Sequence, residues 1–269
     1  QNGGGVFERA FGVARTPRAV FLLASITKPM TATAVMILVD RGRLSLDDPV
    51  QKVIPEFRGG ERGKVLVRHL LTHTSGLPDM LPEDTALRER HAPLTDFVQA
   101  ACRTPLLFSP GTKVQYQSMG VLLAGEMVER VTRLPLREFM RREMFTPLGM
   151  QATSLGLGGR KIADTMPSQD DRKTDWDWNS LYWRDLGSPW GGAFSTAAEV
   201  SRFLRYFLQP EPGILKAGTA AAMIVNQNTG LNEAYGYGWR IGGVRTARGC
   251  SARTFGHSGS TGTISWLDP

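Results

Sequence analysis

Apolar residues gather into one long run in the first half of the chain and into shorter runs further on. The longest covers residues 30–39, follows the apolar residues 20–24 and ends at Asp40-Arg41-Gly42. This length predicts a helix that begins at Ser25, and Gly42 suits a left-handed cap at its end. Shorter patterns predict further helices over residues 67–73, 95–102, 121–131, 135–145, 196–208 and 216–225.

Patterns typical of strands lie at the two ends of the chain, over residues 6–13, 235–241, about 252–255 and 263–267. Residues 151–189 indicate a long loop. We therefore expect an α+β fold in one domain, 1–269, with an antiparallel sheet built from both chain ends and flanked by helices. A mostly helical subregion of about 43–185 is inserted between the sheet-forming segments 1–42 and 186–269.

Composition is ordinary for a globular chain of 269 residues, with 41% hydrophobic and 21% charged residues. The net charge of +7 raises the question of nucleic-acid binding. The arginines are scattered, however, and Arg137, Arg141 and Arg142 share a segment with Glu138 and Glu143, which indicates a solvated helix face. We expect no nucleic-acid partner. No apolar run reaches the ~20 residues that span a bilayer. Compartment and oligomeric state are not predicted.

Metal and disulfide chemistry have little support. Cys102 and Cys250 form neither a disulfide framework nor a metal-binding pattern. His69 and His73 have the i, i+4 spacing of metal ligands, but no glutamate lies between them and no third ligand is evident. We predict a structural role for both histidines and expect no metal or cofactor.

The segment Ser25-Ile26-Thr27-Lys28 places a hydroxyl and an ammonium group one turn apart at the start of the predicted helix. The helix N-terminus is positive, so this arrangement can activate a nucleophilic oxygen and stabilise a nearby oxyanion. A Ser-x-x-Lys pattern alone is weak, because about one occurs by chance in a chain of this size.

Two further polar clusters follow, at Tyr116-Gln117-Ser118 and at His257-Ser258-Gly259-Ser260. With Ser25 and Lys28, their order and spacing resemble the serine β-lactamase and penicillin-binding protein superfamily. The resemblance is to its class C β-lactamase branch, which includes family VIII carboxylesterases and D-stereospecific peptidases. It covers about residues 7–268 and extends to the segments 44–49, 69–77, 147–150 and 191–196.

The resemblance implies acyl transfer through an acyl-enzyme at Ser25. A base must take the serine proton, and both Lys28 and Tyr116 can do so, a choice that the sequence leaves open. Tyr116 would also return a proton to the leaving group, and His257 would stand in the third motif. The backbone N–H groups of Ser25 and Ser260 would form the oxyanion hole.

Two departures from the family pattern bear on substrate choice. Ser118 stands where Asn is common, and His257 stands where Lys is common. Both changes weaken recognition of the amide and carboxylate of β-lactams and D-peptides, and ester hydrolysis needs less of this apparatus. We predict a carboxylesterase acting on small esters. The alternatives are a β-lactamase or D-amino-acid peptidase using the same site, and a non-catalytic binding member, against which the intact Ser25, Lys28 and Tyr116 argue.

Several residues are candidates for substrate contact. Ser118, Ser258 and Gly259 belong to the motifs, and Gly259 would let substrate lie against the strand backbone. An irregular stretch adds aromatic residues that either cover the core or form an apolar wall for the substrate: Trp176, Trp178, Trp183 and Trp190.

A rival nucleophile is Ser258, because residues 256–260 suggest the Gly-x-Ser-x-Gly turn of α/β-hydrolases. The last residue is Ser260 rather than Gly, and no histidine follows Ser258. We therefore reject it. The chain is also short for the family, with little before Phe7 and an end at Pro269 where a closing strand and helix are expected. We interpret the protein as trimmed, or the chain as lacking segments.

Overall fold

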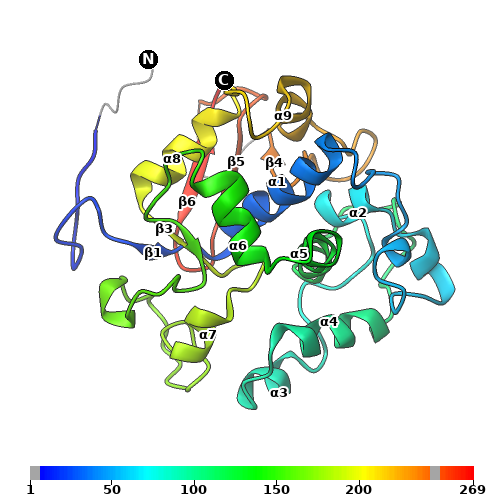
Figure 1. Cartoon of the computed structure of the whole chain (residues 1–269), viewed down its shortest axis with the longest axis horizontal. Coiled ribbons are helices and arrows are strands. Elements are labelled where there is room, and N and C mark those ends of the chain that lie inside the picture. The colour runs from blue at the N-terminus through cyan, green and yellow to red at the C-terminus, as the bar shows by residue number, and fades with distance from the viewer. Residues whose placement is uncertain (1–6, 243–248) are drawn as a thin grey trace.

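The structure, a computed structural model, describes residues 7–242 and 249–269. Helix α1 (Thr27–Asp40) runs through the middle of the molecule, between a helical part and a part that contains the strands (Figure 1). All of its residues from Thr27 to Leu38 are buried. A mainly apolar helix that is buried on every side is stable only when other elements surround it, so the long apolar run explains its central position.

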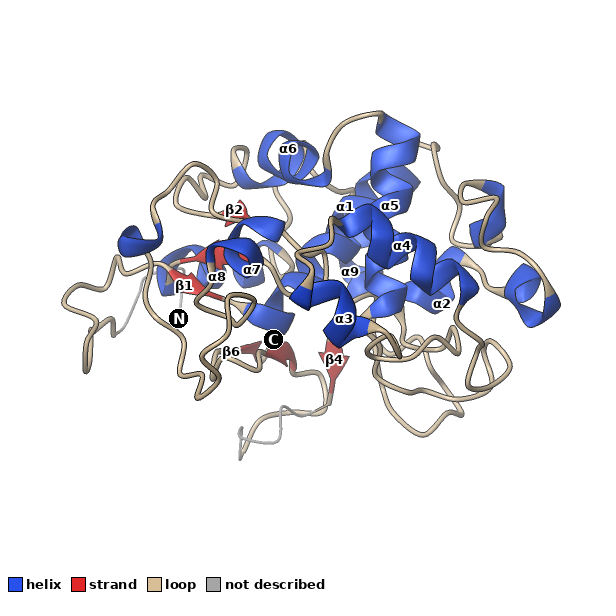
Figure 2. Cartoon of the chain, turned by 90° about the horizontal axis from the view of Figure 1, so that it is seen from below, coloured by secondary structure: helices blue, strands red, loops and turns tan. Residues whose placement is uncertain are grey.

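In the helical part, α2, α4 and α5 lie on one side of α1, whereas α6 lies nearer the strands and contacts β2 (Figure 2). Helix α5 packs against α1, α2, α4 and α6 and forms the centre of this part. Its helices are α2 (Val67–Leu71), α3 (Asp84–Glu89), α4 (Leu94–Arg103), α5 (Met119–Thr132) and α6 (Leu136–Met140).

The strands form two antiparallel sheets of three strands each, in the orders β1-β3-β2 and β4-β5-β6. Helix α8 packs on β6. The strands are β1 (Phe21–Leu22), β2 (Ser154–Leu155), β3 (Ala193–Ser195), β4 (Arg240–Ile241), β5 (Phe255–Ser258) and β6 (Ile264–Leu267). The remaining helices are α7 (Leu181–Leu186), α8 (Ala197–Tyr206) and α9 (Ala217–Met223).

Each predicted helix is present, with changes at the ends. The helix predicted over 196–208 starts where the side chain of Thr196 accepts a hydrogen bond from the N–H of Glu199, at 3.3 Å. The helix predicted over 135–145 is an α-helix only to Met140 and continues as a wider π-helical turn. Helices α3 and α7 were not predicted, because six residues are too few to show a helical period.

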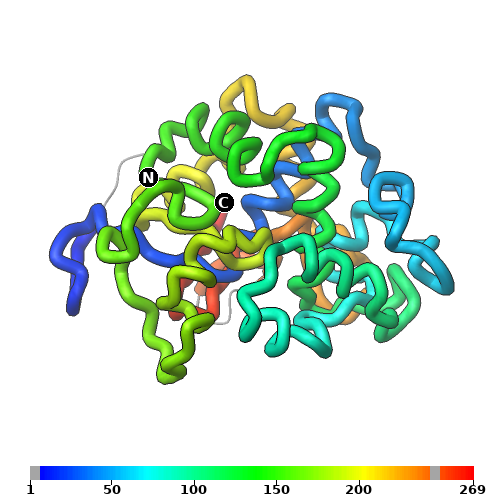
Figure 3. Tube along the Cα trace, turned by 60° about the horizontal axis from the view of Figure 1, so that its bottom comes forward, coloured from blue at the N-terminus to red at the C-terminus, as the bar shows by residue number. Residues whose placement is uncertain are grey.

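The strand predicted over residues 6–13 is wrong. Val6 lies outside the described residues. Phe7, Phe11 and Val13 are 75%, 67% and 74% exposed, and within the described ranges no strand pairs with this segment. Figure 3 shows it, in blue, at the edge of the molecule. A strand needs a partner for its backbone groups, and the local pattern does not reveal whether one exists.

The C-terminal strands are shorter than predicted or shifted along the chain. Of residues 235–241 only Arg240–Ile241 is a strand, because Gly238 turns to pack on α1. A Cβ atom on Gly238 would lie 3.0 Å from the Cα atom of Pro29, so the chain approaches the helix closely at that point. The strand expected near 252–255 begins at Phe255. The N-terminal strand β1 pairs with β3 rather than with the C-terminal strands.

Candidate active site

Ser25 lies in a 3-10 turn, Ala24–Ile26, that joins β1 to α1. Ala24 has a φ of +48°, a left-handed conformation that is costly for a residue with a side chain. The turn is held by Thr27, whose hydroxyl donates to the carbonyl of Ala24 at 2.7 Å and accepts from the N–H of Ala193 at 2.9 Å. Ser25 is half-buried between buried neighbours. This strained and supported turn presents its hydroxyl at a fixed position.

Lys28 points back at Ser25. Its Nζ atom donates to Ser25 Oγ at 3.0 Å and to the carbonyl oxygen of Trp190 at 3.1 Å. The side chain is buried, and this burial lowers the pKa of Lys28 from its ordinary 10.5 to about 7, against a smaller raising effect of the Asp79 charge. A large share of the molecules therefore carries a neutral amine beside the serine hydroxyl at neutral pH.

Tyr116 closes the other side of the serine. Lys28 Nζ lies 4.6 Å from the centroid of its ring. Burial raises the pKa of Tyr116 above its ordinary value, a hydrogen-bonding effect of Ser25 lowers it, and the charge of Asp79 raises it further. The phenol therefore stays protonated at neutral pH and is placed to donate a proton rather than to take one.

The segment around His73 supports the loop that carries Tyr116. His73 Nδ1 accepts from the N–H of Gln117 at 3.2 Å, and its ring lies 4.8 Å from that of Tyr116. Ser75 donates to the side-chain oxygen of Gln117 at 2.5 Å. His69 Nδ1 accepts from the N–H of Leu66 at 3.1 Å. The structural role predicted for the two histidines is confirmed by these hydrogen bonds.

His257, on β5, faces Tyr116 at a ring-centroid distance of 5.9 Å. Its Nδ1 lies 2.7 Å from the carbonyl oxygen of Ser258, so this nitrogen carries the proton and donates. Burial, followed by the charge of Lys28, lowers the pKa of His257 from 6.5 to about 3. The ring is neutral at physiological pH. Its Nε2 is a buried acceptor without a hydrogen-bond donor among the described residues.

The turn after β5 is attached to the chain just before Ser25. Thr261 and Thr263 donate their hydroxyl hydrogens to the carbonyls of Leu22 and Leu23, each at 2.8 Å. A Cβ atom on Gly259 would lie 2.3 Å from the Leu23 carbonyl oxygen. Glycine is therefore required here for packing against the nucleophile turn, while the substrate approach that we expected at this position stays a prediction. This packing brings the Ser260 turn towards Ser25.

Ser260 lies in the turn between β5 and β6 and is exposed. Its backbone N–H donates no hydrogen bond to any residue within 7–242 or 249–269. Such an N–H can bind an oxyanion. Ser258 is exposed at the end of β5, and its carbonyl is the group that holds His257.

Ser118 directly precedes helix α5 and is buried, with its Oγ donating to Asp79 Oδ1 at 2.6 Å. Asp79 itself is exposed. Our sequence reasoning missed this aspartate, and its only signal was its place directly after the 69–77 segment. Arg240, on β4, adds a positive charge that acts on Tyr116 and His257.

The four tryptophans divide into two pairs. Trp183 and Trp190 are buried in the hydrophobic core, with ring centroids 6.3 Å apart, and the contribution of Trp190 to the site is its carbonyl. Trp176 and Trp178 lie beside the guanidinium of Arg172, at 5.9 and 5.0 Å from their ring centroids. The rings thus pack within the core or on the 151–189 segment.

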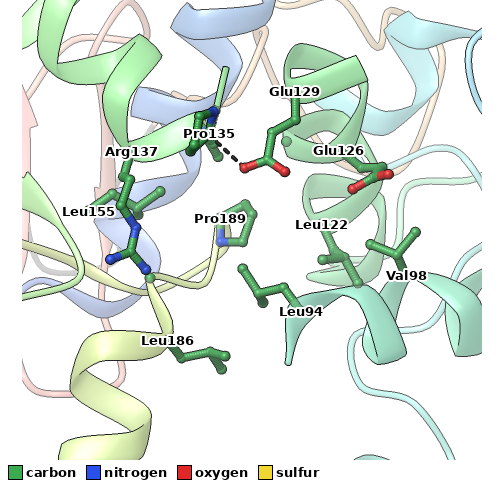
Figure 4. A pocket seen from close by; sticks show the side chains of 13 residues that line it. Leu94, Val98, Leu122, Glu126, Glu129, Pro135, Arg137, Leu155, Leu186 and Pro189 are labelled. Atoms are coloured by element: carbon green, nitrogen blue, oxygen red, sulfur yellow. Dashed lines mark hydrogen bonds between the residues drawn. The ribbon is translucent and has the colours of Figure 1, made fainter. Parts of the chain in front are cut away.

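A cavity of about 210 Å³ lies next to Pro189, between α4, α5 and α6 (Figure 4). The carbonyl of Pro189 accepts from Thr31 of α1, and the next residue supplies the carbonyl that binds Lys28. Ser25, Lys28, Tyr116 and His257 are not among the residues that line the cavity. It is separate from the site described above.

Two wider features complete the description. Among residues 7–242 and 249–269, no three side chains of His, Cys, Asp or Glu cluster as metal ligands would. In the same part of the chain, none of the helices combines the length and the apolar character that a membrane span requires.

Comparison with known proteins identifies the family. The Beta-lactamase family model matches residues 1–269. Penicillin-binding protein 4 of Amycolatopsis lactamdurans is 32% identical to this chain, over 96% of the chain and 70% of that protein. Esterase EstB of Burkholderia gladioli is 37% identical, over 55% of the chain and 41% of the esterase. A putative beta-lactamase structure from Bacteroides dorei DSM 17855 superposes with a TM-score of 0.76 at 26% identity, over 99% and 79% of the two chains. The chain therefore belongs to the beta-lactamase family, a family of serine hydrolases.

Proposed function

We propose that this protein hydrolyses small esters through an acyl-enzyme at Ser25. The observation that carries the proposal is the buried Lys28, whose pKa is about 7 and whose Nζ lies 3.0 Å from Ser25 Oγ. A serine hydroxyl is a weak nucleophile until a neighbouring base takes its proton, and a neutral amine at this distance is such a base.

The same geometry supports a division of roles between Lys28 and Tyr116. Ser25 Oγ attacks the ester carbonyl carbon while its proton passes to Lys28 Nζ, and the N–H groups of Ser25 and Ser260 bind the oxyanion. The phenol of Tyr116 gives its proton to the departing alkoxide and regains one from the Lys28 ammonium. Water then attacks the acyl carbon while one of its protons passes to Lys28 Nζ. As the bond between that carbon and Ser25 Oγ breaks, Lys28 returns the proton to Ser25 Oγ, and the carboxylic acid leaves. The raised pKa of Tyr116 favours Lys28 as the base.

Two features favour esters over β-lactams and D-peptides. His257 is neutral at physiological pH and provides no fixed positive charge for a substrate carboxylate. The hydroxyl of Ser118 already donates to Asp79, so it is less available to a substrate amide. The similarity to EstB, which is named an esterase, agrees with this choice.

A β-lactamase or D-amino-acid peptidase activity at the same site is the second candidate. It is supported by the similarity to penicillin-binding protein 4, which extends over 96% of this chain. A non-catalytic binding role has less support, because burying a lysine beside a serine costs stability and binding alone gives no reason for it.

The test is covalent labelling of Ser25. Intact protein is incubated with a fluorophosphonate and, separately, with a penicillin, and its mass is measured for wild type, Ser25→Ala and Ser258→Ala. We expect fluorophosphonate labelling of wild type and Ser258→Ala but not of Ser25→Ala. If neither the fluorophosphonate nor the penicillin labels the wild type, the proposal is overturned.

Substrate choice needs a second measurement, on protein that the fluorophosphonate has been shown to label at Ser25. We expect kcat/KM for p-nitrophenyl butyrate to exceed that for a chromogenic cephalosporin. A preference for the cephalosporin, together with stable penicillin labelling, would replace the esterase proposal by the second candidate.

A further inference from the structure

Asp79 is an exposed carboxylate next to the segment that carries Tyr116 and Ser118. Its Oδ1 accepts the hydrogen bond from Ser118 at 2.6 Å, and Ser118 follows Tyr116 by two residues. Ser118 is buried, whereas Asp79 is open to solvent. The hydrogen bond therefore holds a solvent-exposed negative charge beside Ser118, two residues along the chain from Tyr116.

This charge has no cation to neutralise it in the part of the chain that the structure describes. No lysine, arginine or histidine of residues 7–242 or 249–269 lies within ion-pair distance of Asp79. Lys28 is a neutral amine in most molecules above pH 7. The charge of Arg240 also acts on Tyr116 and His257, but Arg240 is paired with Glu233 at 3.5 Å and donates to the Tyr235 hydroxyl at 3.2 Å.

The effect of Asp79 reaches the reacting groups. It is the charge that raises the pKa of Lys28 and one of those that raise the pKa of Tyr116. Interactions of this kind fall with distance, so a group bound next to Ser25 lies in the same field. A cationic substrate would gain from that field and an anionic one would lose.

We propose that Asp79 is a specificity-determining residue that favours substrates with an ammonium group near the ester carbonyl and disfavours those with a carboxylate. The inference rests on the proposed ester hydrolysis and refines its substrate class to amino esters. It also opposes β-lactam substrates, since penicillins and cephalosporins carry a carboxylate.

Three methyl esters of similar size test the charge preference. Methyl 3-aminopropanoate is cationic at about pH 8, methyl butanoate is neutral and monomethyl succinate is anionic. We expect wild-type kcat/KM, measured by pH-stat, to fall in that order. In Asp79→Asn the ratio between the cationic and the anionic ester should decrease by about tenfold, the size expected for one partly screened charge.

Three variants separate charge from structure. Asp79→Glu keeps the carboxylate and should retain most of the preference. Ser118→Ala removes the hydrogen bond but leaves the negative charge, so the order of the esters should persist. Glu138→Gln, at a partly exposed carboxylate on α6 that pairs with Arg141, removes one charge elsewhere and should leave the ratio unchanged.

A second readout does not depend on turnover. Binding of the same esters to Ser25→Ala, measured by saturation-transfer NMR, should show the same order, and Asp79→Asn in that background should remove it. If wild type hydrolyses the esters without regard to charge, this inference fails while the esterase proposal stands. If no ester is hydrolysed but binding follows charge and depends on Asp79, the esterase proposal fails and the acidic subsite stands. Binding and turnover that both ignore charge overturn the inference.

Discussion

The two walls of the site differ in how far their charged or titratable side chains are buried. On the wall formed by α1 and β5, Lys28 and His257 are buried, and burial lowers the pKa of both side chains. On the wall formed by the loop after α2 and the start of α5, Asp79 keeps an exposed carboxylate. Removal of water makes the first wall suited to proton transfer at neutral pH, while the exposed charge of the second can select substrates.

Replacing Lys28 should have the largest effect. Lys28→Met removes the base, and we expect kcat/KM for the p-nitrophenyl ester to fall by about 10³-fold or more. Stability should respond differently from activity. The unfolded chain binds a proton at this lysine up to about pH 10.5 and the native chain only up to about 7, so the lysine makes wild-type stability rise with pH between these values.

Urea unfolding of wild type and Lys28→Met at pH 6, 8 and 10 checks the stability part. The difference in unfolding free energy should favour the methionine variant most at pH 6 and shrink as the pH rises. A difference that does not depend on pH would show that Lys28 is not buried as an amine.

Gly259→Ala should disturb the first wall through packing. The new methyl group would lie 2.3 Å from the Leu23 carbonyl oxygen and 2.2 Å from Thr263 Oγ1, so the turn that carries Ser260 must move. We expect a loss of about 1–3 kcal/mol of stability and at least about a tenfold fall in kcat. Thermal unfolding and ester turnover measure these. Gly218→Ala in α9, which has no atom within 4 Å, is the control and should be neutral or slightly stabilising.

His257→Gln tests the neutral state of the second group on this wall. Between pH 6.5 and about 3 the unfolded chain binds a proton at His257 and the native chain does not, so wild-type stability falls as the pH is lowered through this range. In urea unfolding at pH 7, 5 and 4, the unfolding free energy of the variant should therefore decrease less with falling pH than that of wild type. The exposed His91, changed to Gln, serves as the matched control. Equal pH slopes in His257→Gln and wild type would contradict the assignment.

The smallest effect is expected where the two walls interact. Activity towards a neutral ester should rise with pH through the pKa of Lys28, near 7, and Asp79 raises that pKa. Asp79→Asn should therefore move the acid limb of the kcat/KM profile to lower pH, by a few tenths to about one unit. Glu138→Gln should leave it in place. If the acid limb of the profile stays at the same pH or moves to higher pH in Asp79→Asn, the charge of Asp79 does not raise the pKa of Lys28.

Local features of the chain were predictable. Ser25 and Lys28 are three residues apart, a spacing that predicted their contact near the start of a helix, although Ser25 lies in the 3-10 turn before α1. The apolar run that became α1 is long enough to specify a helix without its neighbours. The pairing of Tyr116 and His257 with them was inferred from resemblance, since nothing in the spacing brings residues so distant in sequence together.

Errors arose where a partner lies far along the chain. The segment 7–13 has a sequence pattern typical of a strand, but it pairs with no strand among the described residues. Asp79 lies 39 positions before the serine that it binds, and its exposure left no hydrophobic pattern to mark it. For the tryptophans we left open whether they cover the core or line the substrate site, and the structure places Trp183 and Trp190 in the core and Trp176 and Trp178 beside Arg172.

The sequence by itself determined the spacing of Ser25 and Lys28, the helix that follows and the family to which the chain is similar, because these depend on residues close together or on several motifs in a recognisable order. Only the tertiary structure decided the protonation of the site. The carbonyl of Trp190, 162 positions along the chain, accepts a hydrogen bond from Lys28. Burial removes water from Lys28 and lowers its pKa, and the charge of Asp79 partly raises the pKa again. A pKa depends on every group around an atom, and those groups come together only when the chain has folded.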